Sequence, residues 1–213
     1  MGDLQHTAVQ TPKGTKDFLP EDVKKKRYIE RQLSSLYESY GYREIITPTI
    51  EFYDSLSQGD GPHMAESMYR FFDREGHALA LRPDVTTPIA RVVATRYQGA
   101  ELPLKFHYLA NVFRYGEVAS GHRREFYQAG IELIGQKGPE ADTEVVALAI
   151  ESLKAIGLRR FQFDLGQVDF FRGLIEAAGL PPGAAGRVRE ALLRKDYVGF
   201  GNLIDTAEVP PRL

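Results

Sequence analysis

The chain has 213 residues, of which 43% are hydrophobic and 26% charged, with a net charge of -2 and a pI near 6.2. This composition is typical of a globular protein and lacks the basic excess of nucleic-acid-binding domains. The absence of cysteine excludes disulfides and thiolate metal sites, and no HExxH or glycine-rich nucleotide motif occurs. No apolar run is long enough to span a membrane. We therefore expect a cytoplasmic protein without metal, cofactor, membrane or nucleic-acid contacts.

The first predicted element is a long helix. Residues 1–10 are polar, and we expect them to be disordered. Pro20, followed by Glu21 and Asp22, suits a helix start, because acids favour the positive end of the helix dipole. Gly41 ends the helix. Its apolar stripe at helical spacing comprises Ile29, Leu33, Leu36, Tyr37 and Tyr40.

Short strands and turns follow. Residues 43–47 read as a strand that Pro48 stops, because proline cannot donate to a ladder. The glycine-rich stretch 58–63 predicts a loop. Residues 68–72 and 77–82 flank a turn sequence and predict a hairpin.

The next predicted helix begins at Thr86 or Thr87, either of which can cap it. Residues 104–114 and 124–135 predict a long hairpin. Because helical spacing of apolar residues returns between Pro139 and Gly157, another helix is expected there.

The last part of the chain begins with strict alternation at residues 161–165, which predicts a strand. Two short helical segments are expected after Asp169, split by the glycine- and proline-rich stretch 179–183. Hairpins with helices between them indicate an α+β fold rather than a doubly wound sheet. We expect a core over residues 11–180 and a helical appendage over 181–213.

The second strand of the long hairpin carries a row of side chains that includes a cation, an amide and a carboxylate. Arg124, Gln128 and Glu132 share one parity with Phe126 and Gly130, so all five face one side of the strand. This row predicts the floor of a ligand site, with Gly130 leaving room for something small. The alternative is an ordinary solvent-facing strand, which shows the same alternation. The other face is apolar and comprises Tyr127, Ala129, Ile131 and Leu133.

Four blocks, in this order, resemble the histidyl-tRNA synthetase family of class II synthetases. They are residues 14–20 (GTKDFLP), 41–48 (GYREIITP), 81–86 (LRPDVT) and 113–128 (from FRYGE to REFYQ). The resemblance covers roughly residues 12–180. It implies an antiparallel sheet flanked by helices, and a dimer formed through the first long helix and the strand ending at Pro48.

Within that family the chain is more similar to the non-catalytic paralogue, the regulatory subunit of ATP phosphoribosyltransferase. Asp84 stands where the synthetases have glutamate. Gly116 and Glu117 replace a carboxylate and a cation of the loop that holds ATP in the synthetases, so we expect this ATP loop to be degraded. Arg124 matches an arginine that meets phosphate in the enzymes, and here we expect a structural role.

The resemblance also implies a histidine-binding set. The matching positions are Asp84, Thr86, Arg114, Gln128 and Glu132. The carboxylates would accept from the ammonium or imidazole of histidine, and Arg114 would face its carboxylate. Each position also has a structural interpretation: Asp84 as a turn or cap residue, Thr86 as a helix cap, and Arg114 as an ion-pair partner of Glu132. The lone residues His107 and His122 are expected on the surface or in loops.

The resemblance implies a regulatory subunit that joins the short-form catalytic subunit in the first step of histidine biosynthesis, with histidine as feedback effector. The main alternative is the catalytic core of a histidyl-tRNA synthetase, and a third hypothesis is a histidine sensor with another partner. A glycine-rich block that completes the family's fold and histidine site has no counterpart after Leu180, so the fold is expected to be C-terminally incomplete.

Overall fold

The computed structural model describes residues 10–116, 123–180, 182–193 and 196–206. The chain divides into two compact units, Met1–Phe161 and Gln162–Leu213, and each is described by itself. The predicted division between core and appendage at residue 180 stays a prediction.

The centre of the first unit is a three-stranded sheet in the order β1-β5-β6. The predicted long hairpin is confirmed: β5 (Leu104–Phe113) and β6 (Glu125–Ile134) pair antiparallel over their full lengths. β1 is shorter than predicted, only Arg43–Glu44, and pairs parallel with β5. Within this sheet β6 is an edge strand.

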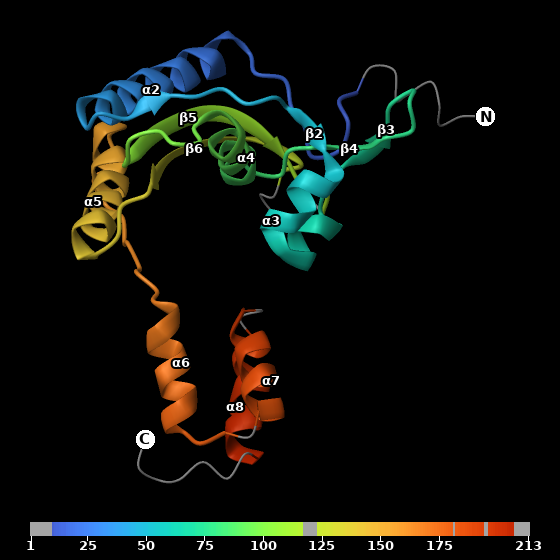
Figure 1. The fold of residues 1–213 in the computed structure, drawn as a ribbon, viewed down its shortest axis with the longest axis vertical. Helices are drawn as coiled ribbons and strands as arrows, with labels where there is room; N and C mark the ends of the chain where they lie inside the picture. Colours follow the sequence, from blue (N-terminus) through green and yellow to red (C-terminus); the bar gives the residue numbers. More distant parts are fainter. Residues whose placement is uncertain (1–9, 117–122, 181, 194–195, 207–213) are drawn as a thin grey trace. The chain divides into compact units, whose positions relative to one another are not determined.

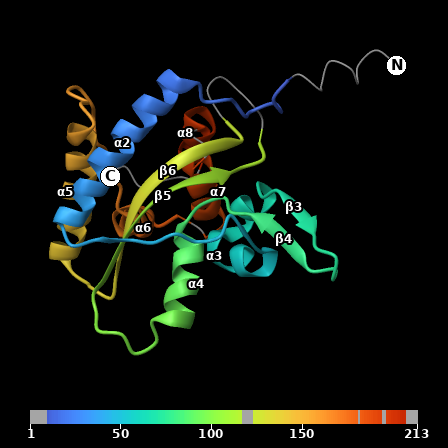
Figure 2. The ribbon, with the colours of Figure 1, turned by 90° about the horizontal axis from the view of Figure 1, so that it is seen from above.

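Helices cover both faces of the sheet (Figure 1). α2 (Pro20–Ser39) and α5 (Pro139–Ala155) lie on one face, and α4 (Thr86–Arg96) lies on the other, as Figure 2 also shows. The predicted extents of α2 and α5 are confirmed. The α2 side of the sheet buries Leu33, Tyr37, Tyr42 and Leu148. The α4 side buries Val85, Ile89, Leu104, Phe106, Tyr108 and Val112. The helix and sheet elements together make the α+β fold that the sequence predicts.

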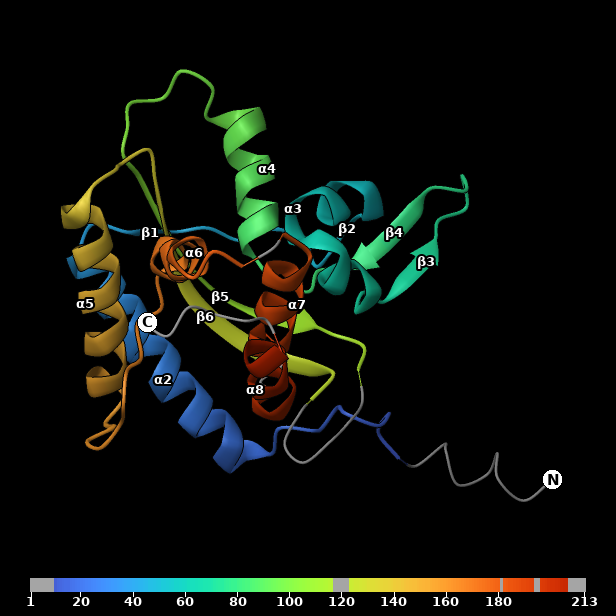
Figure 3. The ribbon, with the colours of Figure 1, turned by 90° about the horizontal axis from the view of Figure 1, so that it is seen from below.

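A second small sheet has the order β2-β4-β3, with α3 beside it (Figure 3). The predicted hairpin is confirmed as β3 (Arg70–Phe72) and β4 (Ala78–Leu81), and β2 (Ile50–Phe52) is a strand that was not predicted. The loop predicted at 58–63 is wrong, because α3 (Tyr53–Glu66) runs through it. Packing overrides the poor helix propensity of its glycines: Leu56 is fully buried against Met68 and Ala80.

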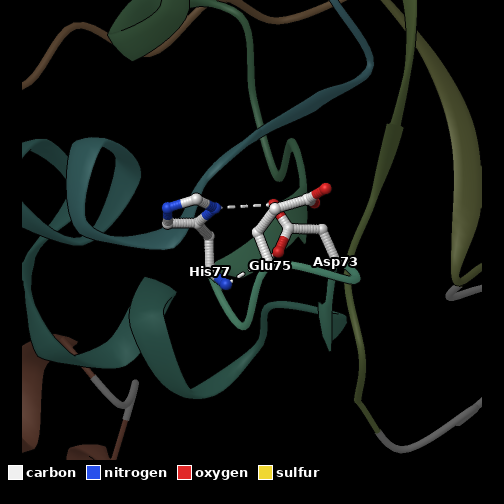
Figure 4. A group of neighbouring side chains, drawn as sticks. All are labelled: Asp73, Glu75 and His77. Atoms are coloured by element: carbon white, nitrogen blue, oxygen red, sulfur yellow. Dashed lines mark hydrogen bonds and ion pairs between the residues drawn. The ribbon is translucent and has the colours of Figure 1, made fainter.

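The turn between β3 and β4 is closed by its own side chains (Figure 4). Asp73 Oδ1 accepts from the backbone N–H of His77 at 2.8 Å, and Asp73 Oδ2 lies 2.8 Å from His77 Nδ1. Glu75 lies close to both side chains. The carboxylate of Asp73 thereby adds to the backbone hydrogen bond that its own N–H donates to His77 O at 3.2 Å.

The second unit is helical, with α6 (Val168–Ala177), α7 (Pro182–Leu193) and α8 (Tyr197–Thr206). The sequence predicted two helical segments here, so the count was wrong. The strand predicted at 161–165 is also wrong: the segment has no regular structure and, within the described ranges, no strand pairs with it. Alternation alone cannot make a strand without a partner.

No helix in the described part of the chain is long and apolar enough to cross a membrane.

Candidate functional site

Two of the predicted site residues lie at the start of α4: Asp84 in the turn before it, and Thr86 as its first residue. The N-cap residue of α4 is Val85, which has no side-chain cap, so the prediction that Thr86 or Thr87 caps this helix is wrong. Asp84 partly fills that role, because its Oδ1 accepts from the N–H of Thr87 at 3.4 Å. The hydroxyl of Thr86 is therefore available elsewhere, and it donates to Glu132 Oε1 at 2.8 Å.

Glu132 lies on the face of β6 that is turned towards α4. Burial raises the pKa of Glu132, the hydrogen bond from Thr86 lowers it, and the charge of Asp84 raises it; the net direction is upward. Among the residues that the structure describes, Glu132 makes no ion pair. A half-buried carboxylate beside a second carboxylate favours a cation at this position.

Tyr108 was missed by the sequence analysis, and it forms part of the same cluster. It pairs with Gly130 across the hairpin, so the two residues face the same side of the sheet. A Cβ on residue 130 would stand 2.9 Å from the ring carbon Cε1 of Tyr108 and closer still to its hydroxyl. The room that Gly130 leaves is thus filled by a tyrosine ring, and the prediction of an open space for a ligand there is wrong. A tyrosine placed opposite a glycine becomes visible only once the hairpin register is known.

Gln128 and Arg114 lie further along the same hairpin. Gln128 shares the face of Gly130 and Glu132, and its Oε1 is buried with no hydrogen-bond partner among the described residues. The Nε of Arg114 donates to the carbonyl of Pro83 at 2.9 Å, and its guanidinium lies 5.2 Å from the centre of the Phe126 ring. These contacts orient Arg114 beside the turn that carries the first two site residues.

The hairpin register excludes the predicted alternative of an Arg114–Glu132 ion pair. Arg114 bonds to Arg124 across the hairpin, whereas Glu132 is opposite Phe106. The two positions are therefore not opposite each other in the ladder, and Arg114 Nε donates to the carbonyl of Pro83 instead.

The predicted ATP-loop positions are described only in part. Glu117 lies outside the described residues. Gly116 is exposed, and its carbonyl accepts from Arg124 Nε at 3.3 Å. The guanidinium of Arg124 lies 4.4 Å from the centre of the Tyr115 ring, and its backbone N–H donates to Gly14 O at 2.8 Å. These contacts agree with a structural role for Arg124, which stays a prediction.

Arg82 is a buried residue that joins the segments around the site. Its side chain is 4% exposed. It donates to Thr47 O at 2.7 Å and to Asn111 O at 2.9 Å, and Asn111 Oδ1 accepts a third bond at 3.2 Å. Because Arg82 precedes Pro83 and Asp84, this network fixes the turn that presents Asp84 and Thr86.

His107 is buried, which corrects the surface position expected from sequence. It is fully inaccessible on the α2 side of β5, and neither ring nitrogen has a hydrogen-bond partner among the described residues. Its ring lies 5.5 Å from that of Tyr37, and Glu38 Oε1 is 4.0 Å from its Nε2. Because it faces away from Glu132, His107 belongs to the core beneath the site. His122, the other histidine expected at the surface, lies outside the described residues.

A separate groove of about 380 Å³ lies on the opposite side of β6, against α2. Its apolar lining includes Phe18, Ile29, Leu33 and Tyr127. The groove is also lined by the basic residues Lys25, Lys26 and Arg123. Of the five predicted histidine-binding residues, only Gln128 reaches this groove. The candidate site is therefore the polar cluster on the α4 side, formed by Asp84, Thr86, Tyr108, Gln128 and Glu132.

Comparisons with known proteins agree with this architecture. A family profile described as histidyl-tRNA synthetase matches residues 14–213. A relative from Ruminiclostridium cellulolyticum, named ATP phosphoribosyltransferase regulatory subunit, is 42% identical over 96% of this chain and 49% of its own length. The chain thus spans about half the length of this curated relative.

Two solved structures are similar. The Bacillus halodurans structure, named ATP phosphoribosyltransferase regulatory subunit/histidyl-tRNA synthetase, has a TM-score of 0.86 and 34% identity over 95% of this chain and 52% of its own. The Alicyclobacillus acidocaldarius structure, named histidine–tRNA ligase subunit, has a TM-score of 0.80 and 29% identity over 94% of this chain and 58% of its own. The predicted class II synthetase-like fold and the resemblance to the regulatory subunits are confirmed. The chain belongs to the histidyl-tRNA synthetase family.

Proposed function

We propose that this protein is a non-catalytic regulatory subunit of ATP phosphoribosyltransferase. It activates the short-form catalytic subunit and transmits feedback by histidine in the first step of histidine biosynthesis. The observation that carries this proposal is the 42% identity, over nearly the whole chain, to a protein named as such a subunit. Feedback requires histidine to bind one state of the complex better than another, with a typical coupling of about 1–3 kcal/mol.

The polar cluster on the α4 side supports histidine as the effector. The half-buried carboxylate of Glu132 suits a cationic group, and the buried Oε1 of Gln128 is an acceptor that a bound N–H can satisfy. Arg114, at the Phe126 end of the row, provides a cation for a carboxylate. A zwitterion with a basic side chain matches this order of charges, with its carboxylate towards Arg114 and its cationic groups towards Asp84 and Glu132.

Self-association is the second part of the proposal. The protein would dimerise through α2 and the segment ending at Pro48, as the family resemblance implies. Ile29 on α2 and Tyr40 at its C-cap are 38% and 40% exposed, and Ile46 is 84% exposed. Apolar side chains that are left in solvent along this helix and segment support the proposed dimer surface.

The test mixes the protein, as its gene encodes it, with the short-form catalytic subunit and measures phosphoribosyl transfer with and without histidine. We expect activation on mixing and inhibition by histidine. Glu132→Gln should weaken the inhibition, whereas the exposed Glu101→Gln serves as the matched control. A catalytic subunit whose activity does not respond to the added protein would contradict the proposal.

The alternative function is histidine activation by a synthetase. It is favoured by the family match and by the similarity to the Alicyclobacillus structure, which is named as a ligase subunit. Histidine-dependent exchange of pyrophosphate into ATP would support it, and its absence, together with activation of the partner subunit, would favour regulation.

A further inference from the structure

The inference concerns the groove between α2 and β6, which lies on the other side of this strand from the polar cluster. Lys25, Ile29 and Leu33 are spaced four residues apart, so they share one face of α2. Leu33 is buried in the core, whereas Ile29 and Lys25 are exposed. From β6, Tyr127 has the parity opposite to that of Glu132 and faces α2. The groove therefore has a floor that belongs to the core and a rim of exposed side chains.

An aromatic pair forms the apolar part of the rim. The rings of Phe18 and Tyr127 meet edge to face with their centres 5.5 Å apart, and Lys26 Nζ lies 3.9 Å from the centre of the Tyr127 ring. These contacts orient Tyr127, although 47% of the residue is exposed. Aromatic side chains that are both exposed and oriented are typical anchors of protein interfaces, in which a few such residues provide most of the binding energy.

The groove carries an excess of positive charge, although the whole chain has a net charge of -2. Two carboxylates line it, and both are already paired. Asp22 Oδ2 lies 3.2 Å from Lys16 Nζ, and Glu30 forms ion pairs with Lys26 and Arg27. The acidic residues at the groove are thus neutralised by cations of the same protein.

Two further cations at the groove are available to a partner. Lys25 and Arg123 are exposed, and neither has an ion-pair partner among the residues that the structure describes. Because both border an apolar surface, the complementary ligand is an apolar side chain with a carboxylate beside it. Such a ligand would cover the exposed aromatic rings and bring opposite charge to both cations.

We propose that this groove is a docking site for the short-form catalytic subunit, and that it takes a segment in which an apolar side chain is flanked by Asp or Glu. The inference rests on the proposed function, which requires this partner but does not say where it binds. A stable interface buries more than about 1,000 Å², so the groove holds an anchor of the interface rather than all of it. The polar cluster lies on the other side of β6, so histidine and the partner can bind at the same time, as feedback requires.

The first test is a double charge reversal, Lys25→Glu with Arg123→Glu. Its matched control is Arg74→Glu with Lys137→Glu, which changes the net charge equally at exposed positions outside the groove. The protein as its gene encodes it is titrated with the catalytic subunit by calorimetry at low and at physiological ionic strength. We expect the reversal to weaken association about 10- to 100-fold and to reduce its salt dependence, because the attraction between opposite charges is lost. The control should change the affinity less than about threefold.

The second test removes the apolar anchor by Tyr127→Ala. Tyr28→Ala is its control, because Tyr28 is 46% exposed on α2 and does not line the groove. Tyr127→Ala should weaken association roughly tenfold or more, the effect of losing an interface anchor, whereas Tyr28→Ala should not. Thermal unfolding is recorded for each variant. Histidine binding should be unchanged in all of them, because the altered side chains lie on the other side of β6 from Glu132.

Three outcomes would overturn the inference. If the catalytic subunit binds both groove variants as tightly as it binds the unchanged protein, it docks elsewhere, and the proposed function stands. If sedimentation shows that the variants lose self-association in the absence of the catalytic subunit, the groove is an interface between two copies of this chain. Neither variant changes Ile29, which also belongs to the proposed dimer surface. If the unchanged protein does not bind the catalytic subunit at all, the proposed function is wrong, and this inference fails with it.

Discussion

Thr86 and Glu132 are 46 residues apart in the chain, and their side chains are joined by a hydrogen bond of 2.8 Å. The bond connects the first residue of α4 to the edge strand β6. Because Val85 and not Thr86 is the N-cap residue of α4, the Thr86 hydroxyl is available to face the sheet. The same bond lowers the pKa of Glu132, against the opposite effects of burial and of Asp84.

Replacing Glu132 with Gln should separate stability from binding. The pKa of Glu132 is raised in the fold, so its contribution to stability is fully present below its unfolded pKa and is lost as pH rises through the folded pKa. Glu132→Gln should therefore be at least as stable as the unchanged protein at pH 7. It should nevertheless bind histidine roughly 10- to 100-fold more weakly, as expected from the loss of one charge-assisted hydrogen bond.

Urea denaturation and calorimetry measure these two effects. Glu101→Gln, on the exposed surface, is the control for both. A Glu132→Gln protein that is less stable at pH 7 but binds histidine normally would show that the carboxylate serves the fold.

His107 should make the protein sensitive to acid. Burial lowers its pKa, and the charges of Glu44 and Glu38 oppose this shift without cancelling it. The unfolded chain therefore binds a proton more readily than the fold, so stability is present above the unfolded pKa of about 6.5 and is lost as pH falls below it. Replacing His107 with Phe keeps a ring beside Tyr37 and should flatten the decline between pH 7 and pH 5.

The measurement is the free energy of unfolding in urea at both pH values. His77→Gln changes an exposed histidine in the β3–β4 turn and retains His107, so it should keep the decline. Equal slopes for His107→Phe and the unchanged protein would show that other groups govern acid sensitivity.

Replacing Arg82 should lower the free energy of unfolding more than most single substitutions do. Arg82→Ala leaves carbonyl groups of Thr47 and Asn111 without a donor inside the protein. Unsatisfied buried acceptors cost about 1–3 kcal/mol each, so a loss of about 3 kcal/mol or more is expected. Arg96→Ala on the exposed end of α4 should cost less than about 0.5 kcal/mol. Chemical denaturation compares the two, and similar losses would contradict the role of the network.

Gly130→Ala should disturb Tyr108 directly. The added Cβ would stand within 3 Å of the tyrosine ring, which is itself packed in the core. Overpacking of this kind typically costs about 1–3 kcal/mol. At Gly116 no atom of the described residues lies within 4 Å of an added Cβ, so Gly116→Ala is the control and should be nearly neutral. Thermal unfolding of both variants tests the contact, and an unchanged melting temperature for Gly130→Ala would argue against it.

The sequence alone determined the elements whose residues repeat with a clear period. The stripe on α2, the helix from Pro139 and the paired strands of the long hairpin were predicted from spacing, and the structure confirms them. Such periods reflect the geometry of a single element, 3.6 residues per turn or two per strand repeat, so they require no knowledge of what packs against it. The parity of Gln128, Gly130 and Glu132 was predictable for the same reason.

Only the tertiary structure decided which residues meet. α3 runs through a glycine-containing stretch and is anchored by Leu56, which is buried against Met68 and Ala80. The alternating segment 161–165 is no strand, because none of the described strands pairs with it. Tyr108 fills the space over Gly130, and His107 is buried against Tyr37, because the register of β5 with β6 and the placement of α2 bring them there. Contacts between distant segments depend on register and packing, which no single stretch of sequence encodes.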